Sequence, residues 1–278
     1  MSRINIDETR NKLTDRLKLY ISLIIKEYGQ NMPPEVFNRL INITDYNSIL
    51  KIYDYGEVSA YANAQNIMMP LCADKILDKV SKIPGYGINK NHKTYRNDNI
   101  IINNNTFFTY VKHIFISGSN AEDYYSDLLL HETMHFCGSG GGSVIKEGIN
   151  ELLTRMLAQK YTLRTNSCGY PKEVALCYKL MEAFGEEAII QLAFINNFGK
   201  EIEYLKENID ENAAKLYMQV VEVAEKEFYE KYYSHMSEFN GVTGIIKKIM
   251  MYRKIDYSKV YELLDNYYKG VETNKVRK

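Results

Sequence analysis

The sequence lacks an excess of charge of either sign and has few cysteines. It contains 35 basic and 35 acidic residues, so its formal net charge at pH 7 is zero. A neutral chain does not create the positive field that attracts nucleic acids or anionic membrane surfaces, and we expect neither as a partner. The 4 cysteines are scattered and form no CxxC pair, which excludes a disulfide framework and a cysteine-based zinc knuckle.

Long apolar segments are also missing. No run approaches the roughly 18 apolar residues that a membrane-spanning helix needs. The first residues, MSRINIDETRNKLTDRLK, are polar and charged where a signal peptide requires an apolar core. We therefore expect a soluble cytoplasmic protein with reduced cysteines. At 278 residues, the chain is long enough to bury a substantial core without disulfides.

Apolar residues at spacings of three and four predict helices over most of the chain. Leu13, Leu17 and Ile21 belong to such a stripe, which predicts an amphipathic helix over residues 7–28. The same reasoning predicts further helices from Pro34 onward, over residues 121–136, over residues 144–163, and through almost all of the chain after Pro171.

One segment instead has the alternating pattern of a strand. Residues 107–117, FFTYVKHIFIS, are rich in aromatic and β-branched side chains, and a shorter strand is predicted at residues 99–102. We therefore predict an α+β protein that is predominantly helical, with a small sheet packed against the helix at residues 121–136. Residues 1–95 would form a mainly helical N-terminal region and residues 96–278 the core with a helical C-terminal region, as two domains or one.

The segment His131-Glu132-Thr133-Met134-His135 has the pattern HExxH. Residues four apart on a helix differ by about 40° in direction and about 6 Å in height, so His131 and His135 project from one face and can share a metal ion. Glu132 lies about 100° away, beside the metal, where its carboxylate can hold a water as a general base. With 5 histidines in the chain, this pattern arises by chance in about 1 of 100 such sequences.

A catalytic zinc ion takes three protein ligands and leaves its fourth position to water. At this point the sequence resembles the gluzincin metallopeptidases, the thermolysin-like and aminopeptidase-like HExxH families, whose third ligand is a glutamate on a following helix. The metzincin pattern, HExxHxxGxxH, is met at Gly138 but fails at Gly141, where a third ligand is required. The resemblance covers residues 107–176 and implies a zinc-dependent hydrolase of peptide bonds.

Two glutamates in the segment KEGINELL compete for the third position. Glu147 precedes a glycine, as does the ligand in the aminopeptidase-like motif NEG, and Glu151 follows one turn later, where both families often have a second acid. The resemblance therefore implies that Glu147 binds zinc and that Glu151 accepts a hydrogen bond from the far ring nitrogen of His131. Aligning GINEL with the thermolysin-like motif instead makes Glu151 the ligand.

The string GSGGGS, residues 138–143, separates the two predicted metal-binding helices. A chain that reverses here needs turn residues at positive φ, which glycine adopts at little steric cost. In the best-known families of this type roughly twenty residues separate the second histidine from the ligand glutamate, so this loop is short. The string also resembles a laboratory linker, but an engineered fusion would not divide a metal motif from its completing glutamate.

Peptide hydrolysis also needs a donor for the developing oxyanion, commonly Tyr, His or Arg in this class, and we select Tyr170 as the candidate. In families that resemble this one, the strand before the metal helix binds an extended substrate along its edge, which implies that role for residues 107–117. The predicted protein is thus a zinc peptidase that acts on a peptide or protein substrate. A catalytically inactive, zinc-stabilised binding protein and a substrate-specific protease effector are the alternatives.

Overall fold

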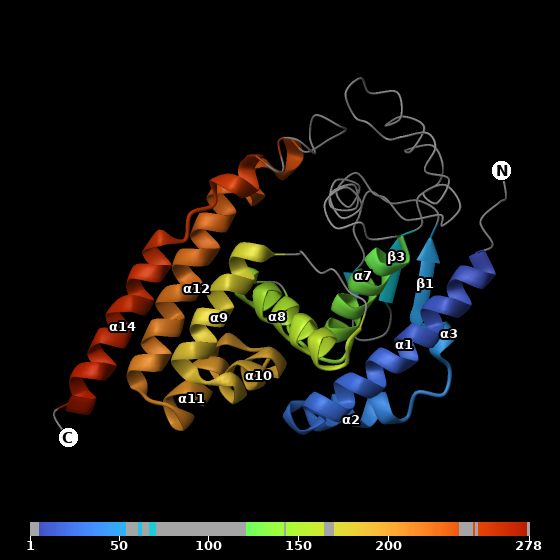
Figure 1. Cartoon of the computed structure of the whole chain (residues 1–278), viewed down its shortest axis with the longest axis horizontal. Helices are drawn as coiled ribbons and strands as arrows, with labels where there is room; N and C mark the ends of the chain where they lie inside the picture. Colours follow the sequence, from blue (N-terminus) through green and yellow to red (C-terminus); the bar gives the residue numbers. More distant parts are fainter. Residues whose placement is uncertain are drawn as a thin grey trace. The chain divides into compact units, whose positions relative to one another are not determined.

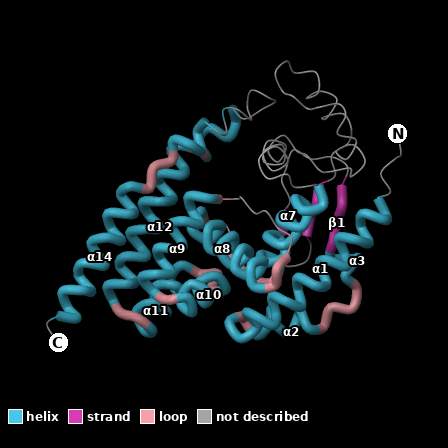
Figure 2. Tube along the Cα trace, in the orientation of Figure 1, coloured by secondary structure: helices cyan, strands magenta, loops and turns pink. Residues whose placement is uncertain are grey.

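The computed structural model describes residues 6–53, 61–62, 67–70, 121–141, 143–163, 170–238, 247 and 250–276 (Figures 1 and 2). Nearly all of the described elements are helices (Figure 2). None of the helices in these ranges combines the length and the apolar composition that crossing a bilayer requires. The chain divides into two compact units, each with its own internal contacts.

The α+β class expected from the sequence is wrong for the described part of the chain. The strands found there are short: β1 (Leu50–Tyr53) pairs in parallel with β3 (Ile67–Pro70), and β2 (Tyr61–Ala62) pairs antiparallel to β3. Residues 99–102 and 107–117, from which the sheet was predicted, lie outside the described residues, so the predicted sheet is not supported. The described core consists almost entirely of helix side chains, because amphipathic helices bury their apolar stripes against one another.

The first unit comprises α1 (Ile6–Tyr28), α2 (Pro34–Ile41), α3 (Tyr46–Ile49), the three strands, α7 (Ala121–Phe136) and the last part of α8 (Val144–Lys160). Helix α1 packs against α7. Its predicted apolar stripe is buried, with Leu17 and Ile24 completely inaccessible to solvent. The carboxylate of Glu27, near the end of α1, binds Lys160 and Tyr161, which joins α1 to the end of α8.

The second unit comprises the first part of α8, α9 (Pro171–Phe184), α10 (Glu186–Phe194), α11 (Phe198–Asn208), α12 (Glu211–Lys231), the 3-10 helix η3 (Tyr233–Glu238) and α14 (Ser258–Val276). The residues of the short η1 (Gly29–Asn31) are divided between the two units. Helix α12 packs against both α11 and α14, and α14 also contacts α9 (Figure 1). Asn197 and Asp210 cap the N-termini of α11 and α12. The domain boundary predicted near residue 95 lies outside the described residues and stays a prediction.

Candidate metal centre

The two histidines of HExxH lie near the C-terminal end of α7. The ring centroids of His131 and His135 are 4.9 Å apart and the rings are inclined by 80°. Both histidines are half-buried, whereas Leu130 and Met134, on the other faces of the helix, are completely inaccessible. Because Leu130 and Met134 are packed into the core, the two histidines lie on the more exposed side of this turn.

Glu147, in the first turn of α8, completes a group of three ligands. Each of His131, His135 and Glu147 offers one ligand atom, and these three atoms lie within 4.8 Å of one another. All three residues are half-buried. A tetrahedral zinc ion with bonds of about 2.0–2.1 Å holds its ligand atoms about 3.4 Å apart, so small side-chain rotations bring these groups into that arrangement. Two imidazoles and one carboxylate are also a ligand set of catalytic zinc sites. The donor set therefore fits zinc.

The two other acids of the motif are buried. Glu132 is 6% exposed and Glu151 is 2% exposed. Glu151 is not part of the ligand group, so of the two assignments left open by the sequence, the structure brings Glu147 to the histidines. The roles of Glu132 as general base and of Glu151 as the partner of His131 stay predictions.

The glycine-rich loop between α7 and α8 is held by hydrogen bonds. Gly138 has a φ of 102°, which confirms the expected positive-φ turn at this position. The amide of Gly140 donates to the carbonyl of Ala193 over 2.8 Å, and Asn196 Nδ2 donates to the carbonyl of Gly138 over 3.2 Å. A Cβ atom on Gly140 would lie 2.5 Å from Asn196 Oδ1. The loop is thus fitted to its surroundings, unlike an inserted linker.

A charged side chain binds each of the two helix ends that flank this loop. At the end of α7, the Arg39 guanidinium donates to the carbonyl of Phe136 over 2.6 Å and lies 4.5 Å from the centroid of its ring. At the start of α8, the amide of Val144 donates to a Glu225 carboxylate oxygen over 2.5 Å. Burial raises the pKa of Glu225, while its hydrogen bonds to the start of α8 lower it. A cation at a helix C-terminus and an anion at an N-terminus both complement the helix dipole.

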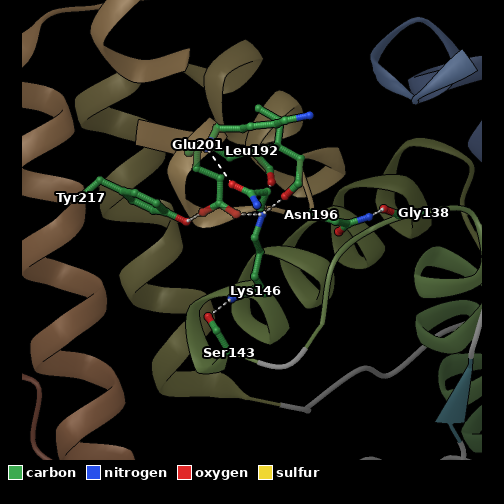
Figure 3. Close-up of polar contacts among 10 residues, drawn as sticks. Gly138, Ser143, Lys146, Leu192, Asn196, Glu201 and Tyr217 are labelled. Carbon is green, nitrogen blue, oxygen red and sulfur yellow. Dashed lines mark hydrogen bonds and ion pairs between the residues drawn. The ribbon is translucent and has the colours of Figure 1, made fainter. Parts of the chain in front are cut away.

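Lys146, adjacent to Glu147, belongs to a buried polar network (Figure 3). Its ammonium nitrogen lies 2.8 Å from Glu201 Oε1, and these two side chains are only 8% and 5% exposed. The ammonium also donates to the carbonyl of Ile195 over 2.7 Å and to that of Leu192. Tyr217 donates its hydroxyl to the second oxygen of Glu201 over 2.8 Å. Burial lowers the pKa of Lys146, and the carboxylate of Glu201 opposes that shift.

Reasoning from the sequence missed these supporting residues. Glu225 lies 81 positions from Val144, so no local pattern connects the two. Lys146 has the appearance of an ordinary solvated helix charge in the sequence, because a lysine is seldom buried without a partner. Only the arrangement of the helices reveals their contribution.

The remaining candidates are less closely tied to the site. Tyr170, the predicted oxyanion donor, is the N-cap residue of α9 and has the left-handed backbone angles φ 46° and ψ 47°. Its role stays a prediction. Of the other histidines in the sequence, His235 lies in η3 and is not part of the ligand group. His92 and His113 lie outside the described residues.

No protein-family model matches the chain, and comparisons with curated proteins and with solved structures gave no match. The resemblance to the gluzincins therefore continues to depend on the motif and its spacing. A proposal about function has to start from the geometry of the ligand group.

Proposed function

We propose that this protein is a zinc-dependent peptidase of the gluzincin type, with His131, His135 and Glu147 as zinc ligands. The observation that carries the proposal is the proximity of the Glu147 carboxylate to both imidazoles. The HExxH pattern alone has a substantial rate of false positives. An acid from a separate helix that lies beside the two histidines is an independent feature, and it is what a catalytic zinc site requires.

The residues predicted to act with the ligands have the chemistry that amide hydrolysis needs. A bound zinc ion would act as a Lewis acid and lower the pKa of a coordinated water to about 7. Glu132 then takes a proton from the attacking water and donates it to the leaving amine, as general base and general acid in turn. Glu151 orients His131 by accepting a hydrogen bond from its far ring nitrogen. Tyr170 donates a hydrogen bond to the oxygen that becomes negative in the transition state.

Metal analysis is the first experiment. Elemental analysis of the purified protein should give about one zinc ion per chain, as expected for a site with one set of three ligands. Glu147→Ala should lose the metal, whereas Glu151→Ala should weaken its binding by about 10- to 100-fold, as outer residues of zinc sites do. A wild-type protein that holds no zinc even after resupply would refute the proposal. Zinc lost with Glu151→Ala and retained with Glu147→Ala would exchange the roles of the two glutamates.

Activity is tested separately, with the zinc-loaded protein and a library of fluorogenic peptides. Cleavage that a chelator abolishes and zinc restores is the expected result. Cleavage restricted to a single sequence would indicate a substrate-specific protease. A protein that binds zinc but cuts no peptide or protein would instead be a zinc-stabilised binding protein, and the hydrolytic part of the proposal would be wrong.

A further inference from the structure

We propose that Lys146 is a positioning residue of the metal centre, which holds the first turn of α8 in the orientation that presents Glu147 to the histidines. This inference rests on the proposed zinc site. It concerns a buried lysine that is not one of the three ligands and that takes no part in the proposed hydrolysis.

The position of Lys146 in the helix makes such control possible. Consecutive residues of a helix point about 100° apart, so Lys146 and Glu147 project in different directions from the same turn. If the Lys146 ammonium is fixed, the rotation of this turn about the helix axis is fixed as well, and with it the direction of Glu147. Glu147 itself is half-buried.

The ammonium of Lys146 has all three of its hydrogens engaged. An ammonium group has three donors and no acceptor, and here the acceptors are Glu201 Oε1 and the carbonyls of Leu192 and Ile195 (Figure 3). Three acceptors in different directions define one location for the nitrogen. The hydroxyl of Tyr217 holds the other oxygen of Glu201, so the partner of the lysine is itself fixed.

The surroundings of this ammonium suit a cation. Leu192 is near the end of α10 and Ile195 is its C-cap residue. Carbonyls at a helix C-terminus lack partners within their own helix and form the negative end of the helix dipole. Together with the carboxylate of Glu201 they provide a negative environment for the lysine. The end of α10 and the side chain of Glu201 therefore act as a fixed anchor for the start of α8.

A buried ion pair of this kind is poor evidence for stability. Removing two charges from water is costly, and replacing such a pair with apolar side chains is often neutral or stabilising. A fully satisfied buried network does specify one geometry in preference to others. The first turn of a helix is also where amides lack intrahelical partners. The network lies at this turn, beside a ligand residue, so its expected effect is on the precision of the site.

The test measures zinc affinity in Lys146→Met, by competition with a chromophoric chelator, together with urea unfolding of the metal-free protein. We expect zinc binding to weaken by about tenfold or more, in the range seen for residues that support metal ligands. In the cobalt(II)-substituted protein, the visible absorption bands, which report ligand geometry, should change as well. A residue with only a structural role would lower the stability of the metal-free protein and leave the cobalt spectrum unchanged.

Lys172→Met is the matched control. Lys172 also donates to backbone carbonyls within the same unit, at 3.3 Å to Tyr252 and 3.0 Å to Arg253, but it lies on α9 and not beside a ligand. The Lys172→Met variant should leave zinc affinity unchanged.

If Lys146→Met does not fold, Glu201→Gln replaces it, because the amide keeps the shape of the carboxylate and removes its charge. The same weakening of zinc binding and the same cobalt change are then expected.

The possible outcomes separate this inference from the proposed function. Wild-type zinc affinity and an unchanged cobalt spectrum in Lys146→Met, or in Glu201→Gln if that variant is needed, would overturn the positioning role and leave the zinc peptidase intact. A wild-type protein without zinc would overturn both. Weakened zinc binding in a protein that cleaves no peptide would support the positioning role and contradict only the hydrolytic activity.

Discussion

Gly148, in α8, and Glu173, in α9, lie so close together that there is no room between them for even a methyl side chain at position 148. A Cβ atom on Gly148 would lie 2.9 Å from Glu173 Cβ and 2.9 Å from the sulfur of Cys177. Glu173 is completely inaccessible, and the hydroxyls of Tyr252 and Tyr257 each donate to its carboxylate over 2.6 Å. The crowded atoms therefore have little freedom to move away.

Gly148→Ala should destabilise the protein by up to about 2 kcal/mol, because overpacking typically costs about 1–3 kcal/mol and alanine regains roughly 1 kcal/mol over glycine in a helix. Gly270→Ala is the matched control, since Gly270 lies in α14 and a Cβ atom there would meet nothing within 4 Å. That variant should be stabilised by up to about 1 kcal/mol. Urea unfolding followed by circular dichroism measures both, and changes of the same sign would contradict the close packing of α8 on α9.

Glu132→Gln should retain zinc and lose most of its activity. Glutamine has nearly the shape of glutamate but cannot take a proton, and general acid–base catalysis typically contributes 10²- to 10⁴-fold. We therefore expect kcat on a cleaved peptide to fall by at least about 100-fold, with zinc content unchanged by elemental analysis. Full activity in this variant would exclude Glu132 as the general base.

Zinc should stabilise the folded protein. An ion that binds only the native state adds RT ln(1 + [L]/Kd) to the free energy of unfolding, about 2.7 kcal/mol when free zinc is 100 times its Kd. Thermal unfolding of chelator-treated and zinc-reloaded protein measures this difference as a rise in Tm. Glu147→Ala should show no such rise, and an equal rise in that variant would mean that zinc binds elsewhere.

Glu225→Ala should destabilise the start of α8. The carboxylate of Glu225 accepts the Val144 amide and so satisfies one of the free donors of this helix. Loss of an N-cap acceptor typically costs about 0.5–2 kcal/mol. Glu222→Ala, which changes an exposed glutamate one turn earlier on α12, should have little effect. Similar losses of stability in the two variants by urea unfolding would exclude a specific capping role.

Glu27 should make stability depend on acidic pH. Hydrogen bonds from Lys160 and then Tyr161 lower the pKa of its carboxyl, whose side chain is 15% exposed. Because the folded pKa is below the unfolded value of about 4.3, the contribution of Glu27 is fully present above that pH. It is lost as the pH falls through the folded pKa.

Urea unfolding of the wild type and Glu27→Gln from pH 7 to the acid limit tests this expectation. The difference in unfolding free energy between the two should be constant near neutrality and should shrink below about pH 4.3. Lys160→Met, which removes the largest cause of the shift, should reproduce most of this behaviour. A difference that grows with acidity would have the wrong sign and would refute the linkage.

The helices could be predicted from the sequence because their apolar residues follow the helical period. The predicted helix at residues 7–28 is α1, the one at residues 121–136 is α7, and the one predicted from residue 144 is α8, which ends at Lys160, three residues before the expected end. The spacing of four residues likewise predicted that His131 and His135 lie on one face of α7, where their rings are neighbours. The choice between Glu147 and Glu151 needed the tertiary structure, because both lie on one face of α8.

Features that depend on distant residues could not be predicted. The ion pair of Lys146 with Glu201 joins α8 to α11, and the cap that Glu225 provides joins α8 to α12. The local sequence around these residues does not indicate either contact. The α+β class failed for a related reason. The sheet was predicted mainly from the alternating pattern of residues 107–117, which lie outside the described residues. The described core is built almost entirely by helices that precede and follow the metal motif in the sequence.

All three proposed zinc ligands belong to two helices that follow each other in the sequence, α7 and α8, joined by the glycine-rich loop. A contact between segments that are close in sequence closes only a short loop, so its entropic cost is small and it can form early in folding. The ion would then be captured by a local unit before the C-terminal helices assemble. Those helices would join this segment later in folding and hold the first turn of α8 through Lys146 and Glu225.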